Sequence, residues 1–330
     1  MMNYENFREA VKEKFMDYMP EQYQDYELKI TPVNKVNETL DGLMLTDRSL
    51  DVNVSPTVYV NEMYKKYQEC GDMEYVIDTY VGIMKSAMNR TPDMVSLDYE
   101  KAADRIVFQL INTRQNQALL DNAPHRPFHD LSVIYRWVIS EDSEGIASTV
   151  VTNSIAKNIN MSEEELYAAA MENTKKILPP VVKNIASVIN EIITNSGMPE
   201  DMTEEMIQEM AQDAWMYVIT NSRGLNGASA VLYEDNLHEL SLKLDSDLYL
   251  IPSSVHEFIA VSTDMGEPDE LASLVVEVNM NNLELSERLS NQVYRYDRET
   301  REITPATDTP NKSLEGPEQS RQAVYRNKER

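Results

Sequence analysis

The sequence predicts an α+β fold in which largely antiparallel sheets are covered by helices, with two subdomains and a flexible C-terminal tail. Three observations predict it. The 330 residues exceed what one hydrophobic core usually holds, so we expect two domains. Strand-like segments follow one another across short turns, between amphipathic helices. Residues 298–330 have mixed charges and few apolar side chains, and such a composition does not fold alone.

The N-terminal subdomain is expected to span residues 1–160. Its first helix is marked by apolar residues at spacings of three or four, namely Tyr4, Phe7, Val11, Phe15 and Tyr18. Asn37 predicts a hairpin, and a helix at 73–88 is expected to end before Pro92. Strands are expected at 27–35, 39–46, 56–60, 105–112, 131–139 and 146–152, with a loop at 121–129 that contains Pro124 and Pro127.

The second subdomain is expected at residues 161–297. Ser162 and Glu165 form a capping box that opens a helix to about residue 177. Helices are also predicted at 181–195 and 203–212. Beyond them the expected order is β-β-α-β-β-α, with helices that begin near Asp235 and Pro268. Strands are expected at 215–220, 228–233, 248–251 (buried on both faces), 255–261 and 293–296, and the last helix is expected to bury Leu271, Leu274, Val275 and Val278.

The charge of the chain limits its partners. Its formal net charge is −26, and residues 185–287 hold twenty carboxylates against two basic residues, Arg223 and Lys243. Such a field repels nucleic acid and anionic membranes and attracts basic surfaces. We therefore expect no direct binding to nucleic acid or membrane, and a basic protein as partner.

Cysteine content and hydropathy predict the compartment. The single cysteine, Cys70, excludes an intrachain disulfide and a cysteine-rich zinc site. No stretch reaches the roughly 20 apolar residues that span a bilayer, and the first ten residues contain charges and no apolar run. These features predict a cytoplasmic protein, and we expect no cofactor.

Several local motifs resemble a known family. They are residues 124–131 (PHRPFHDL) with the following Ile134 and Tyr135, residues 217–221 (YVITN), 225–233 (LNGASAVLY) and 248–257 (LYLIPSSVHE). Together they resemble domain of unknown function 5688, a family from anaerobic gut bacteria, from the first helix to about Tyr296. The resemblance implies a cytoplasmic bacterial protein and assigns no catalytic residue.

His125, His129 and Asp130 are candidates for metal binding. The two histidines are four residues apart, and the carboxylate of Asp130 is adjacent. Pro127 lies between them and opposes a regular helix, and a catalytic zinc needs a third protein ligand and an open position. The alternative is that the imidazoles bond to backbone carbonyls in a packed loop.

Ser253, Ser254, His256 and Glu257 suggest a hydrolase. In a strand, however, Ser254 and His256 lie about 6.6 Å apart along the chain. A nucleophile and its base need a separation of about 3 Å. A bend at Pro252 would be required to bring them together.

Two loops and one helix remain as candidates. Residues 223–227 (RGLNG) are better explained as a tight turn than as a phosphate-binding loop, because no Gly-Lys-Ser/Thr follows. Asp245 and Asp247 are better explained as a helix-to-strand turn than as a calcium loop. The helix at 203–212 combines a methionine stripe with carboxylates, which favours either core packing or docking of a basic partner. Its candidate interaction residues, with those that flank it, are Glu200, Asp201, Glu204, Glu205, Glu209 and Asp213.

Three functional hypotheses follow. The first is an interaction or regulatory module without catalysis. The second is a nucleic-acid mimic that occupies the basic groove of a DNA- or RNA-binding protein, which requires carboxylates in ordered rows. The third is a hydrolase that uses His125, His129 or His256, which requires a pocket that gathers one of them with carboxylates.

Overall fold

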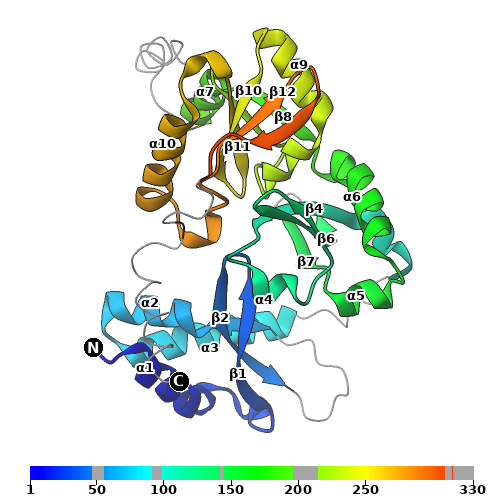
Figure 1. The fold of residues 1–330 in the computed structure, drawn as a ribbon. Coiled ribbons are helices and arrows are strands. Elements are labelled where there is room, and N and C mark those ends of the chain that lie inside the picture. The colour runs from blue at the N-terminus through cyan, green and yellow to red at the C-terminus, as the bar shows by residue number, and fades with distance from the viewer. Residues whose placement is uncertain (47–55, 91–98, 142–144, 196–214, 309–313, 315–330) are drawn as a thin grey trace, which may run out of the picture. The chain divides into compact units, whose positions relative to one another are not determined.

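A computed structural model describes residues 1–46, 56–90, 99–141, 145–195, 215–308 and 314 (Figure 1). The chain divides into two compact units, residues 1–97 and 98–330. The α+β class is confirmed, and every strand pairing among the described residues is antiparallel. The division lies near residue 97, whereas the sequence predicted a boundary at 160.

In the first unit, the described residues form a three-stranded sheet and three α-helices. The hairpin predicted around Asn37 is present, and Asn37 adopts a φ of 65° in its turn. The apolar stripe of the first helix forms a core in which Phe7, Val11 and Phe15 are fully buried. The elements are α1 (Tyr4–Lys14), β1 (Glu27–Lys35), β2 (Glu38–Thr46), β3 (Thr57–Tyr59), α2 (Val60–Cys70) and α3 (Met73–Arg90).

A four-stranded sheet begins the second unit. Its central strand, β6, pairs with β4, β5 and β7, and β4 is buried along its whole length. Helix α6 packs on β4, and the Thr174 hydroxyl accepts the backbone N–H of Phe108. The elements are β4 (Ile106–Asn112), α4 (Gln117–Leu120), β5 (His125–Phe128), β6 (Leu131–Glu141), β7 (Ile146–Val150), α5 (Asn153–Asn158) and α6 (Glu163–Ile177).

A six-stranded sheet completes the second unit, with the strand order β13-β12-β10-β11-β9-β8. Helix α10 packs on β10 and runs along the side of this sheet in Figure 1. The elements are β8 (Pro180–Asn184), α7 (Ile185–Asn195), β9 (Tyr217–Asn221), η5, a 3-10 helix (Gly227–Leu232), α9 (Glu234–Leu244), β10 (Leu248–Ser254), β11 (Glu257–Ser262), α10 (Pro268–Asn281), β12 (Tyr294–Asp297) and β13 (Glu302–Pro305).

A polar chain joins the four-stranded sheet to the loop before η5. Arg136 on β6 donates to the side-chain oxygen of Gln109 on β4 (3.1 Å), and Gln109 donates to the side-chain oxygen of Asn226 (3.0 Å). Burial lowers the pKa of Arg136. The Arg136 guanidinium also donates to the side-chain hydroxyl and to the backbone carbonyl of Ser148. The buried charge is therefore hydrogen-bonded.

Several local predictions were wrong. The predicted loop at 121–129 contains β5, because its backbone pairs with β6. The predicted helix at 181–195 is split, and residues 180–184 form β8 on the edge of the large sheet. The predicted strand at 228–233 is instead the 3-10 helix η5. Strand β10 alternates between buried and half-buried residues, so that only one of its faces is fully covered.

The predicted tail begins too early. Residues 302–305 form β13, which pairs with β12, and Thr307 is buried. Leu314 is buried too, and its carbonyl accepts a hydrogen bond from Arg288 (3.0 Å). The segment pairs with β12, which lies in the folded unit. The composition of the segment alone does not reveal this pairing. The other residues of the predicted tail, 309–313 and 315–330, lie outside the described residues.

Candidate functional site

Asp130 is committed to hydroxyl groups from a distant part of the chain. Its two carboxylate oxygens accept hydrogen bonds from Ser290 (2.6 Å) and Tyr294 (2.5 Å), both of which are fully buried. Burial and then the charge of Asp130 raise the pKa of Tyr294 well above its ordinary value. Asp130 therefore ties the β5–β6 turn to the start of β12 and to the segment before it.

The structure separates His125 from His129. His125 begins β5 and its Nδ1 lies 2.9 Å from the Ala123 carbonyl oxygen. His129 lies in the turn after β5, with a φ of 56°, and its ring contacts Phe128 and Tyr294. Four residues along a strand span roughly 13 Å. This arrangement does not fit a shared metal site, and no group of three or more His, Cys, Asp and Glu side chains in the described ranges could hold a metal ion.

Ser254 and His256 do not form a nucleophile–base pair in this arrangement. The Ser254 hydroxyl accepts the backbone N–H of His256 (3.0 Å), and the imidazole Nδ1 accepts the backbone N–H of Asn226 (3.1 Å). The Nε2 atom lies 3.9 Å from the Glu287 carboxylate. His256 therefore fastens the loop around Asn226 to the β10–β11 turn, and Ser254 has no general base on its hydroxyl.

The loop at 223–227 is a turn, as predicted, but it leads into η5 instead of a strand. Gly224 adopts a φ of 62°, and Asn226 adopts 52°. Arg223 forms an ion pair with Glu141 (2.8 Å). The one basic side chain of this loop is thus already engaged.

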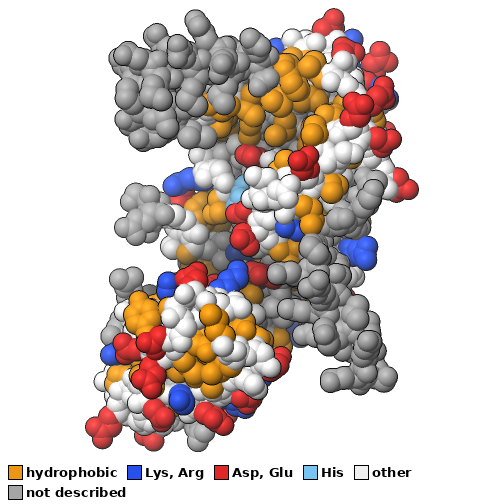
Figure 2. Space-filling model, turned by 90° about the vertical axis from the view of Figure 1, so that its left-hand side faces the viewer, with side chains coloured by type: hydrophobic (Ala, Val, Ile, Leu, Met, Phe, Trp, Pro, Cys, Tyr) orange, Lys and Arg blue, Asp and Glu red, His pale blue; other side chains and the backbone are white. Residues whose placement is uncertain are grey.

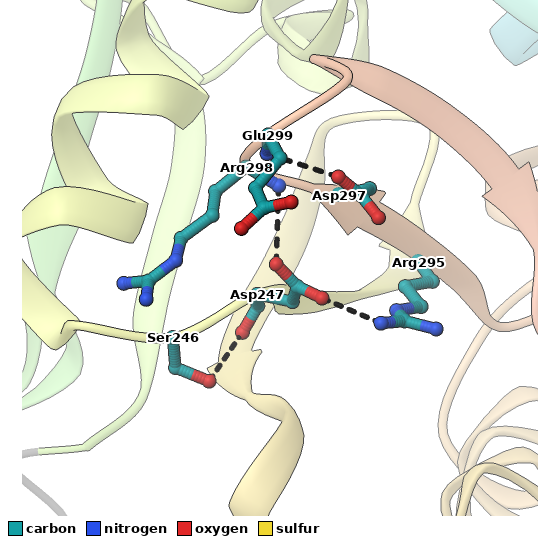
Figure 3. Close-up of a pocket in the computed structure, with 6 residues that line it drawn as sticks. All are labelled: Ser246, Asp247, Arg295, Asp297, Arg298 and Glu299. Atoms are coloured by element: carbon teal, nitrogen blue, oxygen red, sulfur yellow. Dashed lines mark hydrogen bonds and ion pairs between the residues drawn. The ribbon is translucent and has the colours of Figure 1, made fainter.

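The predicted turn at Asp245 and Asp247 is confirmed, and it lies beside an open hollow of about 360 Å³ (Figure 3). Asp245 ends α9 with a φ of 48°. The Asp247 carboxylate accepts from the Arg295 guanidinium (2.6 Å) and from the backbone N–H of Arg298 (3.1 Å). Because both oxygens of Asp247 bond to the β12–β13 hairpin, this aspartate fastens the hairpin to the start of β10.

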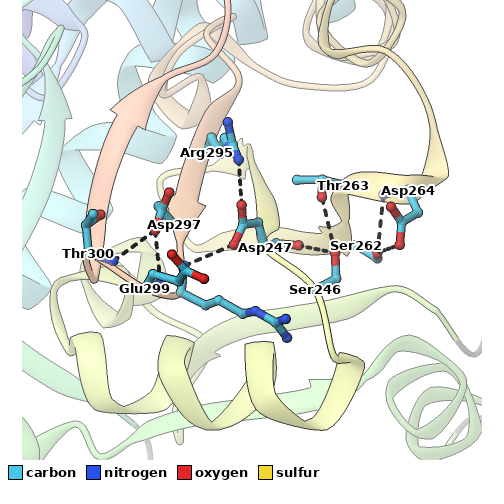
Figure 4. Close-up of polar contacts among 10 residues, drawn as sticks. Ser246, Asp247, Ser262, Thr263, Asp264, Arg295, Asp297, Glu299 and Thr300 are labelled. Carbon is cyan, nitrogen blue, oxygen red and sulfur yellow. Dashed lines mark hydrogen bonds and ion pairs between the residues drawn. The ribbon is translucent and has the colours of Figure 1, made fainter.

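The hydrogen bonds around Asp247 extend to further residues on both sides of it (Figure 4). Asp297 accepts the backbone N–H groups of Glu299 and Thr300, each at 2.9 Å, and these bonds help to lower the pKa of its carboxyl group. On the other side, the Ser246 hydroxyl lies 3.1 Å from that of Thr263. These side chains bond to one another and to nearby backbone N–H groups, which accounts for their positions without a ligand.

Helix α10 exposes part of the face that the sequence assigned to the core. Ala272, Val275 and Asn279 are buried, whereas Leu274 is 58% exposed and Val278 is 44% exposed. The Asn279 amide donates to the Ser290 carbonyl oxygen (3.2 Å), and this bond selects the buried face. Leu274 and Val278 are four residues apart and form one apolar strip on the outside of the helix.

The segment that carries this apolar strip is rich in carboxylates. Residues 264–287 contain seven carboxylates and no Lys or Arg: Asp264, Glu267, Asp269, Glu270, Glu277, Glu284 and Glu287. Within the described ranges none of the seven forms an ion pair with Lys or Arg. Figure 2, which looks onto the side that carries α10, shows hydrophobic side chains gathered on the second unit with carboxylates along their border. We call Leu274, Val278, Glu270 and Glu277 the α10 face.

The sequence itself carries a signal for this face. Six apolar residues lie between positions 271 and 278, namely Leu271, Ala272, Leu274, Val275, Val276 and Val278. They extend over more of the helix circumference than one buried stripe needs. The interaction residues that the sequence did suggest, Glu200, Asp201, Glu204, Glu205, Glu209 and Asp213, lie outside the described residues.

Near His125, both carboxylate oxygens of Glu163 accept hydrogen bonds. Glu163 accepts two hydrogen bonds from Arg126 (3.1 and 2.7 Å) and one from Tyr135. Burial alone would raise the pKa of Glu163, but these hydrogen bonds outweigh it and hold the pKa below its ordinary value of 4.5. A depressed pKa means that the ionised carboxylate stabilises the fold.

We expect Glu163→Gln to lower the free energy of unfolding by about 1 kcal/mol at pH 7, because the ion pair is only partly shielded from water. The folded-state pKa lies below the unfolded one, so this contribution is present above pH 4.5 and is lost as the pH falls through the folded-state pKa. Urea denaturation of both proteins between pH 7 and pH 3 measures it. Glu164→Gln, at the exposed neighbouring position in the same helix turn, should lower the free energy of unfolding by less than about 0.5 kcal/mol. A constant difference between Glu163→Gln and the unmodified protein down to pH 3 would contradict the assignment.

Comparison with known proteins identifies one family. The model of a family of unknown function, DUF5688, matches residues 4–298, which confirms the resemblance seen in the motifs. No curated protein and no solved structure matches the chain significantly. None of the helices in the described ranges is both long and apolar enough to cross a membrane.

Proposed function

Because the chain belongs to the DUF5688 family, whose function is unknown, its role has to be inferred from the molecule, and we propose that it is a protein-interaction module without catalysis. Its α10 face docks a basic amphipathic helix of a partner protein. The observation that carries this proposal is the exposed pair Leu274 and Val278 beside Glu270 and Glu277, neither of which forms an ion pair with Lys or Arg in the described ranges.

The chemistry of the α10 face specifies its partner. Leu274 and Val278 favour a partner that buries apolar side chains, since burial of one leucine contributes about 1.5–3 kcal/mol. The flanking carboxylates favour Lys and Arg around those side chains and oppose an acidic partner. A helix with one apolar stripe and basic flanks satisfies both requirements, as in other helix-in-groove complexes.

The two alternative hypotheses have less support from the geometry. A nucleic-acid mimic needs continuous rows of charge, whereas apolar residues interrupt the carboxylates on α10. A hydrolase needs a nucleophile near its base, and Ser254 and His256 are both committed to backbone groups. His125 and Glu163 do line one open hollow, but no Ser, Thr or Cys is among the residues that line it. The exposed thiol of Cys70 supports the further proposal that the protein works in the reducing cytoplasm.

The α9 helix supplies matched controls for a binding test. Leu242 on α9 is 60% exposed, close to the 58% of Leu274, and Glu239 lies three residues before it as an exposed carboxylate. Glu277 lies three residues after Leu274 on α10. The two helices therefore offer the same side chains at nearly equal exposure.

We expect a leucine–lysine helical peptide of about 14 residues, the length of α10, to bind the full chain. Leu274→Ser should weaken binding about tenfold and Glu277→Lys about fivefold, because each removes about 1–1.4 kcal/mol of contact energy. Leu242→Ser and Glu239→Lys should leave the dissociation constant within twofold. Fluorescence anisotropy of the labelled peptide measures it, and high salt should weaken binding.

If substitutions on α9 and α10 weaken peptide binding equally, the peptide responds to the overall charge of the protein. The proposal that it docks on the α10 face would then be rejected. Sensitivity to Glu277→Lys without sensitivity to Leu274→Ser would favour the nucleic-acid mimic instead. Self-association that Leu274→Ser abolishes would identify a second copy of the chain as the occupant, and would also reject the basic partner.

A further inference from the structure

The buried side chain of Arg288 holds the chain at Leu314, close to the end of α10. The Arg288 guanidinium donates to the Leu314 carbonyl oxygen (3.0 Å) and twice to the Leu283 carbonyl oxygen (3.1 and 3.0 Å). Its Nη1 atom also lies 4.0 Å from the sulfur of Met280, which belongs to α10. Leu314 itself is only 1% exposed. The chain beyond Leu314 therefore starts near the carboxyl end of α10.

Residues 321–330, which lie outside the described residues and which we call the basic segment, have the opposite charge to the α10 face. One acidic residue, Glu329, stands against four basic ones, and the basic residues flank a short apolar run at 323–325 (AVY). The basic residues are Arg321, Arg326, Lys328 and Arg330. The α10 face favours this composition in an occupant, because its carboxylates attract Lys and Arg and its apolar strip accepts apolar side chains.

The basic segment begins within reach of the α10 face. Leu274 lies six residues before Met280, which is about 9 Å along a helix. The six residues 315–320, which join Leu314 to the basic segment, span up to about 20 Å when they are extended. The basic segment can therefore lie beside Leu274 and Glu277 while Leu314 stays bonded to Arg288.

We propose that the basic segment covers the α10 face of its own chain and competes there with the partner protein. The inference rests on the proposed function, because it concerns the regulation of the same face. A segment on a short linker meets its site at an effective concentration in the millimolar range. Pairs of exposed charges are individually weak, so the dissociation constant of the segment alone is of the same order and the face is covered in about two thirds of the molecules. The apparent dissociation constant of a partner is then about threefold higher than on the uncovered face.

The test variant is the full chain with Arg326→Glu and Lys328→Glu combined. It should tighten binding of the leucine–lysine peptide about threefold in the anisotropy titration, because the reversed charges no longer hold the basic segment on the α10 face. The matched control combines Lys157→Glu and Lys176→Glu, which change the net charge equally at two exposed lysines on α5 and α6. The control should change the dissociation constant by less than about 1.5-fold, since salt screens distant charges.

Methyl NMR without any peptide observes the α10 face directly. The Leu274 and Val278 methyl signals should differ between the unmodified chain and the test variant, whereas the Leu242 signals on α9 should stay in place. High salt should remove most of this difference, because it releases the basic segment from the α10 face in the unmodified chain. The control variant should leave the methyl signals of all three residues unchanged.

The two measurements separate this inference from the proposed function. Unchanged Leu274 and Val278 signals in the test variant would overturn the inference, even if the peptide binds more tightly, because the peptide would then respond only to the altered charge. Equal tightening in the control variant would overturn it as well. If the two signals change but the peptide does not bind, the basic segment is the occupant of the α10 face and the basic partner is rejected.

Discussion

Gly227→Ala is expected to lower the free energy of unfolding of the second unit by about 3 kcal/mol. A Cβ atom at this position would overlap the Thr220 hydroxyl. It would also lie 2.5 Å from the His256 carbonyl oxygen and 2.8 Å from the Asn221 backbone nitrogen. The last two atoms belong to the backbone at the end of β9 and the β10–β11 turn, which cannot move without disturbing the large sheet.

Urea denaturation followed by tryptophan fluorescence measures this effect, because both tryptophans, Trp137 and Trp215, lie in the second unit. Gly145→Ala is the matched control. Gly145 has no atom within 4 Å of the added Cβ and no positive φ, so its substitution should change stability by less than about 0.5 kcal/mol. Equal denaturation midpoints for the two variants would refute the close approach at Gly227.

Asp130→Ala is expected to cost about 3 kcal/mol of stability. The substitution leaves the buried hydroxyls of Ser290 and Tyr294 without their acceptor, and each unpaired buried hydroxyl costs about 1–3 kcal/mol. Asp130→Asn keeps the shape and one accepting oxygen, so we expect about half of that loss. The measurement is again the urea midpoint from tryptophan fluorescence.

The same series separates a structural role of Asp130 from metal binding. His125 is exposed, and among the described residues its imidazole forms one hydrogen bond, to the nearby Ala123 carbonyl, so His125→Ala should cost less than about 1 kcal/mol. A chelator should leave the midpoint of the unmodified protein unchanged. If the chelator instead lowers the midpoint, or if His125→Ala costs as much as Asp130→Ala, the metal hypothesis would regain support.

Local patterns predicted the elements whose stability is local. The stripe from Tyr4 to Tyr18 follows the helical repeat and packs into one core, although α1 itself ends at Lys14 and a 3-10 turn continues it. The capping box of Ser162 and Glu165 is present, with both of its hydrogen bonds. In these cases residues within one or two turns determine the structure, so the spacing is sufficient.

Elements that depend on distant partners could not be predicted. The apolar residues Val181 and Val182 are compatible with a strand or a helix. They form strand β8 because their backbone pairs with β9. The run at 228–233 looks like a strand, but Asn226 in the left-handed region and the close approach at Gly227 turn it into η5. Similarly, the partners of Asp130 lie 160 residues away or more, so the sequence could not reveal its role as a structural tie.

The most relevant error concerns α10. Leu274 and Val278 satisfy the helical repeat as well as the buried residues do, so hydrophobicity alone assigns them to the core. The structure buries Asn279 instead, because its amide bonds to the Ser290 carbonyl and to Asn291. A buried polar anchor thus rotates the helix and leaves two large apolar side chains outside. That rotation creates the α10 face.

The most direct test of the account is methyl NMR of the full chain during titration with the leucine–lysine peptide. We expect the methyl signals of Leu274 and Val278 to shift with the same dissociation constant that anisotropy gives, because peptide side chains cover them. The Leu242 methyl signals on α9 should stay in place. A complex that forms while Leu274 and Val278 remain unshifted, or that shifts Leu242 to the same extent, would contradict docking on α10.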